Sequence, residues 1–327
     1  MGRRRLGRGR RAALGWLAAL ALLAWLSPAA ARAGPALLVD AQSGRVLHAH
    51  EPFRRWYPAS LTKLMTLYVA FAAMESGRVS PETPVRISER AAAAPFNNTG
   101  WPVGTEIPLQ EAVPLLVVKS ANDVAIAVAE TVSGEAEAFI AEMNAAADEL
   151  GMAGTAFVNP NGIHDAGQVT TARDLALLAT ALLRDFPQHR HHFAIPSVRL
   201  NGETVPSPNR LLGRLPGADG MKTGYLCASG LNIVASATRG GRTLVAVVLG
   251  ALREGGREAV AGELLETGFA ALAGGPPAGP RLADLDPPAD PPEPVDMRAY
   301  ACEGRAPPAA LASFGLQGTA PLPRPRP

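Results

Sequence analysis

Lysine is nearly missing from this sequence. The 327 residues carry 31 basic side chains, and only three of them are lysine: Lys63, Lys119 and Lys222. Arginine therefore serves almost everywhere that a positive charge suffices, and a lysine that persists is expected where arginine cannot replace it. Lysine can lose its proton when buried, whereas arginine effectively cannot. The three lysines thus indicate general-base chemistry, with chance retention as the alternative.

Cysteine is also scarce, since Cys227 and Cys302 are the two examples. Neither has a histidine close by in sequence, which argues against a catalytic thiol. An exported protein would allow the two to form a disulfide. Because Cys302 lies in an irregular, proline-rich part of the chain, the sequence leaves this pairing open.

Acidic residues are absent from residues 1–33, which instead hold seven arginines. Six of these precede a non-polar stretch over residues 12–26, and Ala31-Arg32-Ala33 fits a small-x-small cleavage site. We therefore expect residues 1–33 to be a signal peptide. An N-terminal membrane anchor is the alternative, but the apolar stretch is shorter than the ~20 residues that span a bilayer. No later segment is long and apolar enough to do so.

Removal of residues 1–33 changes the formal net charge from +2 to −5, because seven arginines and no acids are lost. A mildly acidic mature chain argues against a nucleic-acid partner. We expect an exported, periplasmic protein, with attachment to the surface of the inner membrane left open.

The pattern of apolar residues predicts one main domain over residues 34–273. A helix over residues 60–76 is apolar nearly all round and belongs inside such a domain. The expected elements are strands at 36–40 and 45–48, a mainly helical region over 81–156, a helix at 171–184, a hairpin of strands 230–238 and 243–250, and a helix at 257–273. Residues 274–327 contain 14 of the 30 prolines and few large apolar side chains, so we expect a poorly ordered tail.

The first motif is Ser60-Leu61-Thr62-Lys63. Positions i and i+3 share a face of a helix, so the hydroxyl and the ammonium should lie side by side. Buried among apolar residues, Lys63 could be neutral and accept the proton of Ser60. The alternative is an ordinary serine cap with a surface lysine, which the apolar character of the helix disfavours.

The second motif, Ser120-Ala121-Asn122, lies between two apolar helices, where a loop can project polar groups into a cleft. Asn122 could instead cap the helix that follows it. The third motif, Lys222-Thr223-Gly224, precedes the predicted hairpin. It offers strand-edge amides, a cation and a hydroxyl for a carboxylate, and a glycine that allows close approach of a substrate. A generic turn into a strand is the alternative.

The three motifs occur in the order S-x-x-K, S-x-N and K-T-G, which resembles the motif set of penicillin-binding proteins and class A β-lactamases. Over roughly residues 35–272 the chain resembles a low-molecular-mass penicillin-binding protein of the serine D-alanyl-D-alanine carboxypeptidase family. The resemblance implies an α/β (α+β) fold of the β-lactamase/transpeptidase type, with a five-stranded antiparallel sheet flanked by helices and an inserted helical lobe. The matching stretches are Pro58-Ala59-Ser60-Leu61-Thr62-Lys63, Lys119-Ser120-Ala121-Asn122-Asp123, Asn159-Pro160-Asn161-Gly162, Thr171-Ala172-Arg173-Asp174, Gly220-Met221-Lys222-Thr223-Gly224-Tyr225 and Ala228-Ser229-Gly230-Leu231-Asn232.

The resemblance also implies roles for these residues. Ser60 would attack the carbonyl of the penultimate D-alanine and form an acyl-enzyme, with Lys63 as the base. Ser120, with Asn122 and Lys222, would relay protons to the leaving D-alanine. The family implies peptidoglycan stem peptides as the substrate, β-lactam antibiotics as covalent inhibitors, and no metal or cofactor.

The remaining implied residues bind the substrate. Thr223 and Lys222 would hold its terminal carboxylate, beside Gly224. The backbone N–H groups of Ser60 and Tyr225 would form the oxyanion hole, a feature that contributes several kcal/mol to rate enhancement. Arg253 is a further candidate for the carboxylate.

The chain departs from the family pattern in its short, proline-rich end, which shows no amphipathic membrane-binding helix. His189, His191 and His192 form a cluster for which a solvated loop is favoured over a metal site. A D,D-endopeptidase with the same residues is one alternative function. A β-lactamase lacks support because no Glu-x-x-Leu-Asn loop separates the second and third motifs, and a non-catalytic wall-binding scaffold would not need Ser60 and Lys63.

Overall fold

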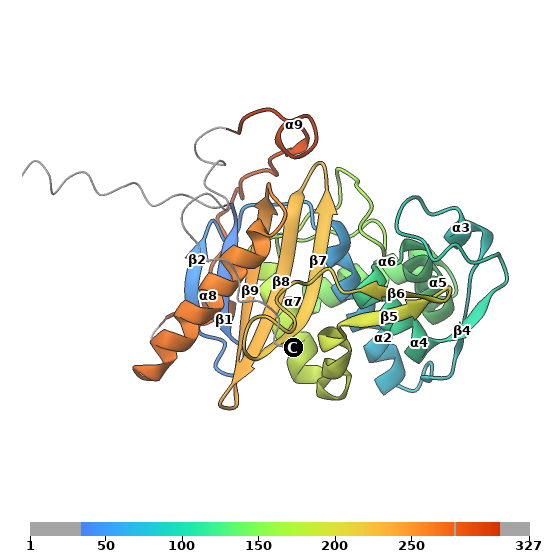
Figure 1. Ribbon diagram of the computed structural model, residues 1–327, viewed down its shortest axis with the longest axis horizontal. Helices are drawn as coiled ribbons and strands as arrows, with labels where there is room; N and C mark the ends of the chain where they lie inside the picture. The colour runs from blue at the N-terminus through green and yellow to red at the C-terminus, as the bar shows by residue number, and fades with distance from the viewer. Residues whose placement is uncertain (1–33, 278, 308–327) are drawn as a thin grey trace, which may run out of the picture.

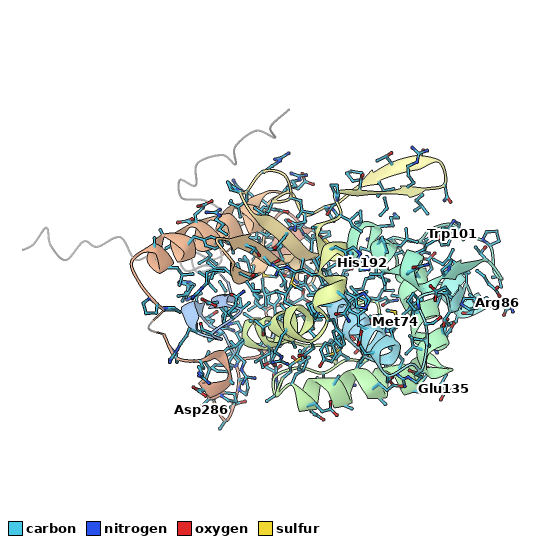
Figure 2. All side chains as sticks on the ribbon, turned by 90° about the horizontal axis from the view of Figure 1, so that it is seen from below. Met74, Arg86, Trp101, Glu135, His192 and Asp286 are labelled. Carbon is cyan, nitrogen blue, oxygen red and sulfur yellow. A yellow bond between two sulfur atoms is a disulfide. The ribbon has the colours of Figure 1, made fainter. Side chains whose placement is uncertain are left out.

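The computed structural model describes residues 34–277 and 279–307, and the expected signal peptide lies outside the described residues. A five-stranded sheet with its helices occupies one end of the long axis, and a helical lobe occupies the other (Figure 1). The side chains of Arg86, Trp101 and Glu135 mark the lobe, whereas Asp286 lies at the sheet end (Figure 2). Within the described residues, no helix is long and apolar enough to cross a membrane.

The sheet has the strand order β2-β1-β9-β8-β7, and every neighbouring pair is antiparallel. This confirms the expected five-stranded sheet. Strand β7 forms one edge, so one of its sides is open to a substrate. The strands are β1 (Ala36–Asp40), β2 (Val46–His50), β7 (Ala218–Leu226), β8 (Gly230–Arg239) and β9 (Arg242–Ala251).

Both faces of the sheet are covered by helices. Alternate side chains of a strand point to opposite faces, so each strand contributes to two apolar clusters. On β9, Leu244 and Ala246 pack with α8 (Gly256–Ala273) in one apolar cluster. Val245 and Val247 belong to the larger cluster on the other face, which includes α2 and α7. The central strands are therefore apolar on both faces.

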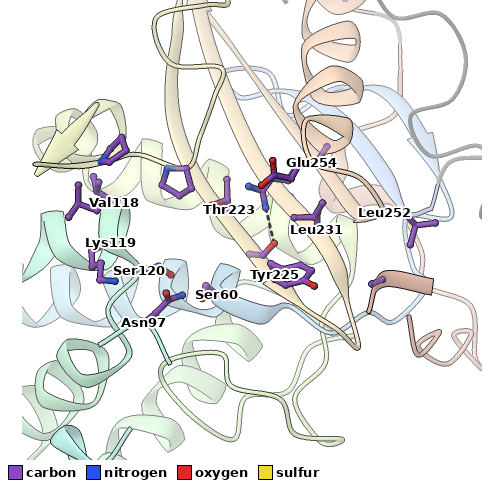
Figure 3. Close-up of a pocket in the computed structure, with 16 residues that line it drawn as sticks. Ser60, Asn97, Val118, Lys119, Ser120, Thr223, Tyr225, Leu231, Leu252 and Glu254 are labelled. Carbon is purple, nitrogen blue, oxygen red and sulfur yellow. Dashed lines mark hydrogen bonds between the residues drawn. The ribbon is translucent and has the colours of Figure 1, made fainter. Parts of the chain in front are cut away.

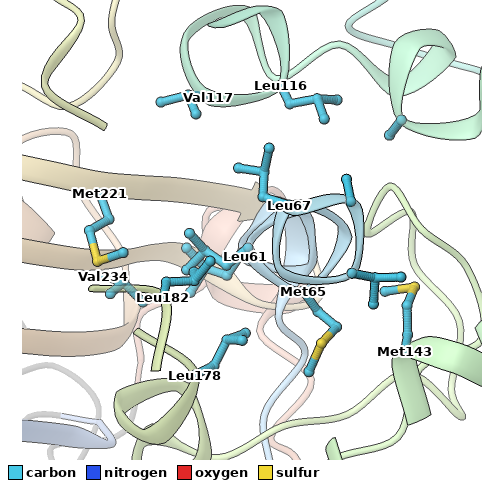
Figure 4. Close-up of a cluster of buried hydrophobic side chains, with 14 of the residues drawn as sticks. Leu61, Met65, Leu67, Leu116, Val117, Met143, Leu178, Leu182, Met221 and Val234 are labelled. Carbon is cyan, nitrogen blue, oxygen red and sulfur yellow. The ribbon is translucent and has the colours of Figure 1, made fainter. Parts of the chain in front are cut away.

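Helix α2 (Lys63–Glu75) passes through the centre of the molecule. It lies between Leu116 and Val117 on one side and Leu178 and Leu182 of α7 on the other (Figure 4). The first turn of the predicted 60–76 helix is a separate 3₁₀ turn, η1 (Ala59–Thr62). Because three residues complete one 3₁₀ turn, positions i and i+3 eclipse each other, which brings Ser60 directly beside Lys63.

The remaining elements build the lobe, helix α7 against the sheet, and the short helices of the C-terminal tail. The helical prediction for 81–156 and for 171–184 is confirmed. A short hairpin that the sequence did not predict, β5–β6, lies over the lobe (Figure 1). These elements are β3 (Pro84–Arg86), α3 (Glu89–Ala92), β4 (Glu106–Pro108), α4 (Leu109–Pro114), η2 (Leu115–Lys119), α5 (Asn122–Ser133), α6 (Ala136–Glu149), α7 (Ala172–Asp185), η3 (Pro187–Ala194), β5 (Ser197–Leu200), β6 (Glu203–Pro206), η4 (Leu282–Asp284) and α9 (Arg298–Ala301).

The expectation of a poorly ordered tail is wrong for residues 279–307. Leu282 is 2% exposed and Met297 is fully buried, so this segment contributes to the core. Cys302 forms a disulfide with Cys227, which answers the question that the sequence left open. Proline removes backbone freedom and donors but does not prevent an extended chain from packing on a surface. The compact unit therefore continues past residue 273, and residues 308–327 lie outside the described residues.

Candidate active site

A groove of about 630 Å³ runs between the edge strand β7 and the lobe (Figure 3). Each of the three sequence motifs contributes to its lining, so the fold brings together residues that are more than 160 positions apart. The lining residues are Ser60, Asn97, Val118, Lys119, Ser120, Val205, Pro206, Pro208, Thr223, Gly224, Tyr225, Leu231, Leu252, Glu254, Arg257 and Ala301.

Lys63 is fully buried at the base of the groove. Its Nζ lies 3.2 Å from Oγ of Ser60, 2.7 Å from Oδ1 of Asn122 and 2.5 Å from the carbonyl oxygen of Asn161. Burial lowers the pKa of Lys63 well below its ordinary value, and the charge of Lys222 lowers it further. The neutral form of Lys63 is therefore much more accessible than that of an exposed lysine.

A neutral lysine matches these three partners. An uncharged amine has two N–H donors and one lone pair, and an oxygen of a carbonyl or amide can only accept. In the neutral form, Asn122 and Asn161 would take both N–H groups of Lys63, and its lone pair would be left for the hydroxyl of Ser60. Lys63 in that form could remove the proton of Ser60.

A second lysine–serine pair lies across the groove. Nζ of Lys222 donates to Oγ of Ser120 at 3.0 Å and to the carbonyl oxygen of Thr223 at 2.8 Å. Burial, with a contribution from the charge of Arg257, lowers the pKa of Lys222 to about 7. Ser120 follows the single π-helical turn η2 and has a φ of 61°. This rare conformation for a residue with a side chain is typical of functional sites.

Asn122 does not cap the helix that follows it. It is the first residue of α5, and Ala121 precedes the helix without a side-chain cap. Its Nδ2 donates to the carbonyl oxygens of Pro95 at 3.0 Å and Phe96 at 3.3 Å, while its Oδ1 accepts from Lys63. Asn122 therefore links the base of the groove to the loop that carries Asn97.

The third motif lies within the edge strand, so the alternative of a turn into a strand is wrong. Thr223 lies in the groove and is 5% exposed, and Tyr225 is 49% exposed. Gly224 lines the groove, and the structure adds a second reason for a glycine there. A Cβ there would lie 2.9 Å from the carbonyl oxygen of Pro58 and 3.1 Å from the nitrogen of Ser60. Gly224 therefore also lets β7 pack closely against the segment that carries Ser60.

Arg257 is a site residue that the sequence analysis missed. It is 9% exposed, lines the groove, and donates through Nη1 to the carbonyl oxygen of Gly224 at 3.1 Å. Glu258 pairs with its Nε at 2.9 Å. Arg253, the residue named from sequence, is exposed and does not belong to the groove lining. Arg257 lies one helical turn further along the chain, and its position in a buried N-terminal turn of α8 is the signal that distinguishes the two.

The histidine cluster lies in the 3₁₀ helix η3, where His191 is exposed but His189 and His192 are partly buried, so the expected solvated loop is wrong for these two. The rings of His189 and Phe71 stack with centroids 4.0 Å apart, and His192 lies within 5.8 Å of His189. Burial lowers the pKa of His192 to about 4, so its ring is neutral at physiological pH. In the part of the chain that the structure describes, no group of three or more His, Cys, Asp or Glu side chains is placed to hold a metal ion.

Gly162 packs against the backbone of Ala59 and Ser60. Its φ is +84°, and a Cβ at this position would overlap the carbonyl group of Ala59 and lie 3.0 Å from the nitrogen of Ser60. We expect Gly162→Ala to displace Ser60 and to lower its rate of acylation by at least about ten-fold, because misplaced reacting groups lose their orientation. The rate of labelling by a fluorescent penicillin measures this effect.

Gly134→Ala is the matched control for Gly162→Ala. Gly134 has a φ of +82° and no atom within 4 Å of the added Cβ, so its variant tests backbone strain alone. We expect a loss of stability of about 1 kcal/mol or more without a change in acylation. Equal acylation rates in the two variants would contradict the role of Gly162.

Comparison with known proteins agrees with this geometry. Residues 24–253 match the family model of D-alanyl-D-alanine carboxypeptidases, Peptidase S11. The D-alanyl-D-alanine carboxypeptidase DacA of Haemophilus influenzae is 34% identical over 239 residues, which are 72% of this chain and 61% of that protein. The chain thus spans less than two thirds of the length of this relative.

Solved structures show the same fold. Penicillin-binding protein 5 of Haemophilus influenzae has a TM-score of 0.71 and 34% identity, covering 75% of this chain and 73% of that one. Penicillin-binding protein D2 of Listeria monocytogenes in its ampicillin-bound form has a TM-score of 0.64 and 28% identity, covering 72% and 97%. The family model, the sequence relatives and the shared fold together show that this chain belongs to the D-alanyl-D-alanine carboxypeptidase family of serine peptidases.

Proposed function

We propose that this protein is a serine-type D-Ala-D-Ala carboxypeptidase that removes the terminal D-alanine from peptidoglycan stem pentapeptides. The observation that carries the proposal is the pair of buried lysines, each within hydrogen-bond distance of a serine hydroxyl in one groove. Lys63 has two oxygen acceptors besides its serine, which would take both N–H groups of the neutral amine and leave its lone pair for the proton of Ser60. Ser60 is therefore the nucleophile.

Acylation begins when Oγ of Ser60 attacks the carbonyl carbon of the penultimate D-alanine, as Lys63 takes the hydroxyl proton. The backbone N–H groups of Ser60 and Tyr225 donate to the oxyanion that forms. Collapse of this intermediate breaks the peptide bond and leaves an ester on Ser60. Ser120 gives its proton to the departing amine and is reprotonated by the ammonium of Lys222, to which it is hydrogen bonded.

The positive charges at one end of the groove select a C-terminal carboxylate. Thr223 supplies a hydroxyl, and Lys222 and Arg257 lie beside it.

Water then hydrolyses the ester. Among the described residues that line the groove, Glu254 is the one with a carboxylate that could activate a water molecule. It pairs with Arg210 at 3.1 Å and lies away from Ser60 (Figure 3). This placement supports slow hydrolysis of a penicilloyl ester and disfavours a β-lactamase.

We further propose that the chain is exported to the periplasm, with residues 1–33 as its signal peptide. The Cys227–Cys302 disulfide supports an oxidising compartment, since such bonds persist outside the cytosol. β-Lactams would bind as covalent inhibitors because they offer Ser60 a reactive carbonyl beside a carboxylate.

The test is the release of D-alanine from a stem pentapeptide that ends in D-Ala-D-Ala. We expect one D-alanine per pentapeptide, and no release from the same peptide ending in D-Ala-L-Ala. A cross-linked peptide dimer serves as the competing substrate, with products identified by mass spectrometry. Cleavage of the dimer in preference to the pentapeptide would replace the proposal with a D,D-endopeptidase.

A further inference from the structure

The C-terminal tail returns to the groove after crossing the sheet end of the domain. Backbone hydrogen bonds attach it at three places. The carbonyl oxygen of Pro280 accepts from Val46 at 2.9 Å, that of Pro292 accepts from Arg55 at 2.9 Å, and the nitrogen of Met297 donates to Ala228 at 3.0 Å. The tail is therefore held along its described length before it reaches the active site.

The disulfide then brings the tail beside Tyr225. Cys227 is two residues beyond Tyr225, and its partner Cys302 has its Sγ 3.2 Å from the hydroxyl of Tyr225. Ala301, the residue before Cys302, lines the groove and packs against the core. Figure 3 shows the short helix α9 at this end, beyond Tyr225 and beside Leu252. Part of the groove wall thus comes from a segment that sequence composition places outside the catalytic domain.

The direction of the substrate identifies what this wall meets. The terminal carboxylate is placed at Thr223 and Lys222, and the scissile carbonyl at Ser60, so the peptide continues along the edge of β7 past Tyr225. Three apolar residues, Leu231, Leu252 and Ala301, line the groove together with the exposed Tyr225. An aliphatic side chain would bury apolar surface at this position, whereas the leaving D-alanine does not reach it.

We propose that Ala301 and Cys302, fixed by the disulfide, form a tail wall that binds the aliphatic side chain of the residue preceding the D-alanine pair. This inference rests on the proposed function, because it assumes the direction of the bound peptide. The tail wall contributes to binding of the longer peptide and takes no part in the chemistry at Ser60. Its loss therefore raises KM for the peptide and leaves kcat and acylation by benzylpenicillin unchanged.

Two variants test the tail wall in the full mature protein. The double variant Cys227→Ser/Cys302→Ser removes the tether without leaving a free thiol, and Ala301→Asp places a charge in the wall with the disulfide intact. For each we expect KM for the pentapeptide to rise about five-fold, as loss of one or two buried methylene contacts implies, with kcat within about two-fold. Ala299→Asp, on the same helix but outside the groove lining, is the matched control and keeps the wild-type KM.

A binding measurement separates this inference from the proposed function. The pentapeptide competes with a fluorescent penicillin for Ser60, and its inhibition constant reports affinity whether or not D-alanine is released. The same five-fold weakening in both variants supports the tail wall even in a protein that releases no D-alanine, a result that would count against the carboxypeptidase alone. Unchanged inhibition constants, failure of the peptide to compete with the wild type, or an equal loss of penicillin acylation would overturn the tail wall.

Discussion

Incubation of the mature protein with benzylpenicillin is expected to add the mass of one penicilloyl group, and Ser60→Ala is expected to add none. Ser60 is the proposed nucleophile, and its hydroxyl lies 3.2 Å from Nζ of Lys63, a buried lysine whose pKa is lowered well below its ordinary value by burial. Removal of this oxygen eliminates the covalent intermediate, so kcat for D-alanine release should fall by a factor on the order of 10⁶, as for other serine peptidases that lose their nucleophile. Intact-mass spectrometry and the release assay measure the two effects.

Ser76→Ala is the control for this experiment. Ser76 lies at the other end of α2 and donates to the carbonyl oxygen of Ala73, away from the groove. The control should acquire the penicilloyl mass at the wild-type rate. If the wild type remained unlabelled while penicillin was consumed, the protein would be a β-lactamase, and if penicillin stayed intact, the assignment of Ser60 would be wrong.

Lys63→Arg is expected to lower the rate of penicillin acylation by about 10³- to 10⁴-fold, the upper part of the range that general-base catalysis contributes. Arginine keeps its proton at every accessible pH, so the variant has no lone pair for the hydroxyl of Ser60. It also places a permanent charge where burial disfavours one. Stopped-flow or fluorescent labelling measures the rate, and the melting temperature shows whether the variant is folded.

The pH profile distinguishes a lost base from a merely disturbed site. In the wild type, the acylation rate should rise with pH as Lys63 loses its proton. It should fall above about pH 7, because Lys222 then loses the proton with which it would reprotonate Ser120. Lys63→Arg should lose the rising limb. Lys119→Arg, a lysine of the groove lining for which no role is proposed, should keep both limbs. A rising limb that persisted in Lys63→Arg would show that another group is the base.

Much of this molecule follows from local sequence. The apolar strands, the hairpin of β8 and β9 and the buried helix α2 are set by short-range patterns of apolar residues and by the glycines between them. The pairing of Ser60 with Lys63 is local as well, because three residues of a helical turn separate them. The scarcity of lysine indicated Lys63 and Lys222, whose pKa values the fold lowers strongly. It did not distinguish them from Lys119.

Contacts between distant segments decided the partners of the site residues, the pKa of Lys222 and the position of the tail. Ser120 and Lys222 are 102 positions apart, and burial of Lys222 against Arg257 is what lowers its pKa. Asn122 reads as a helix cap in sequence, but its partner Lys63 comes from another helix. The tail is attached by backbone hydrogen bonds, which have no compositional signature, and by a disulfide that the two cysteines allowed but did not determine. Sequence pattern thus determined which groups are present, and tertiary packing determined their charge, their partners and the boundary of the groove, because desolvation and long-range contacts exist only in the folded chain.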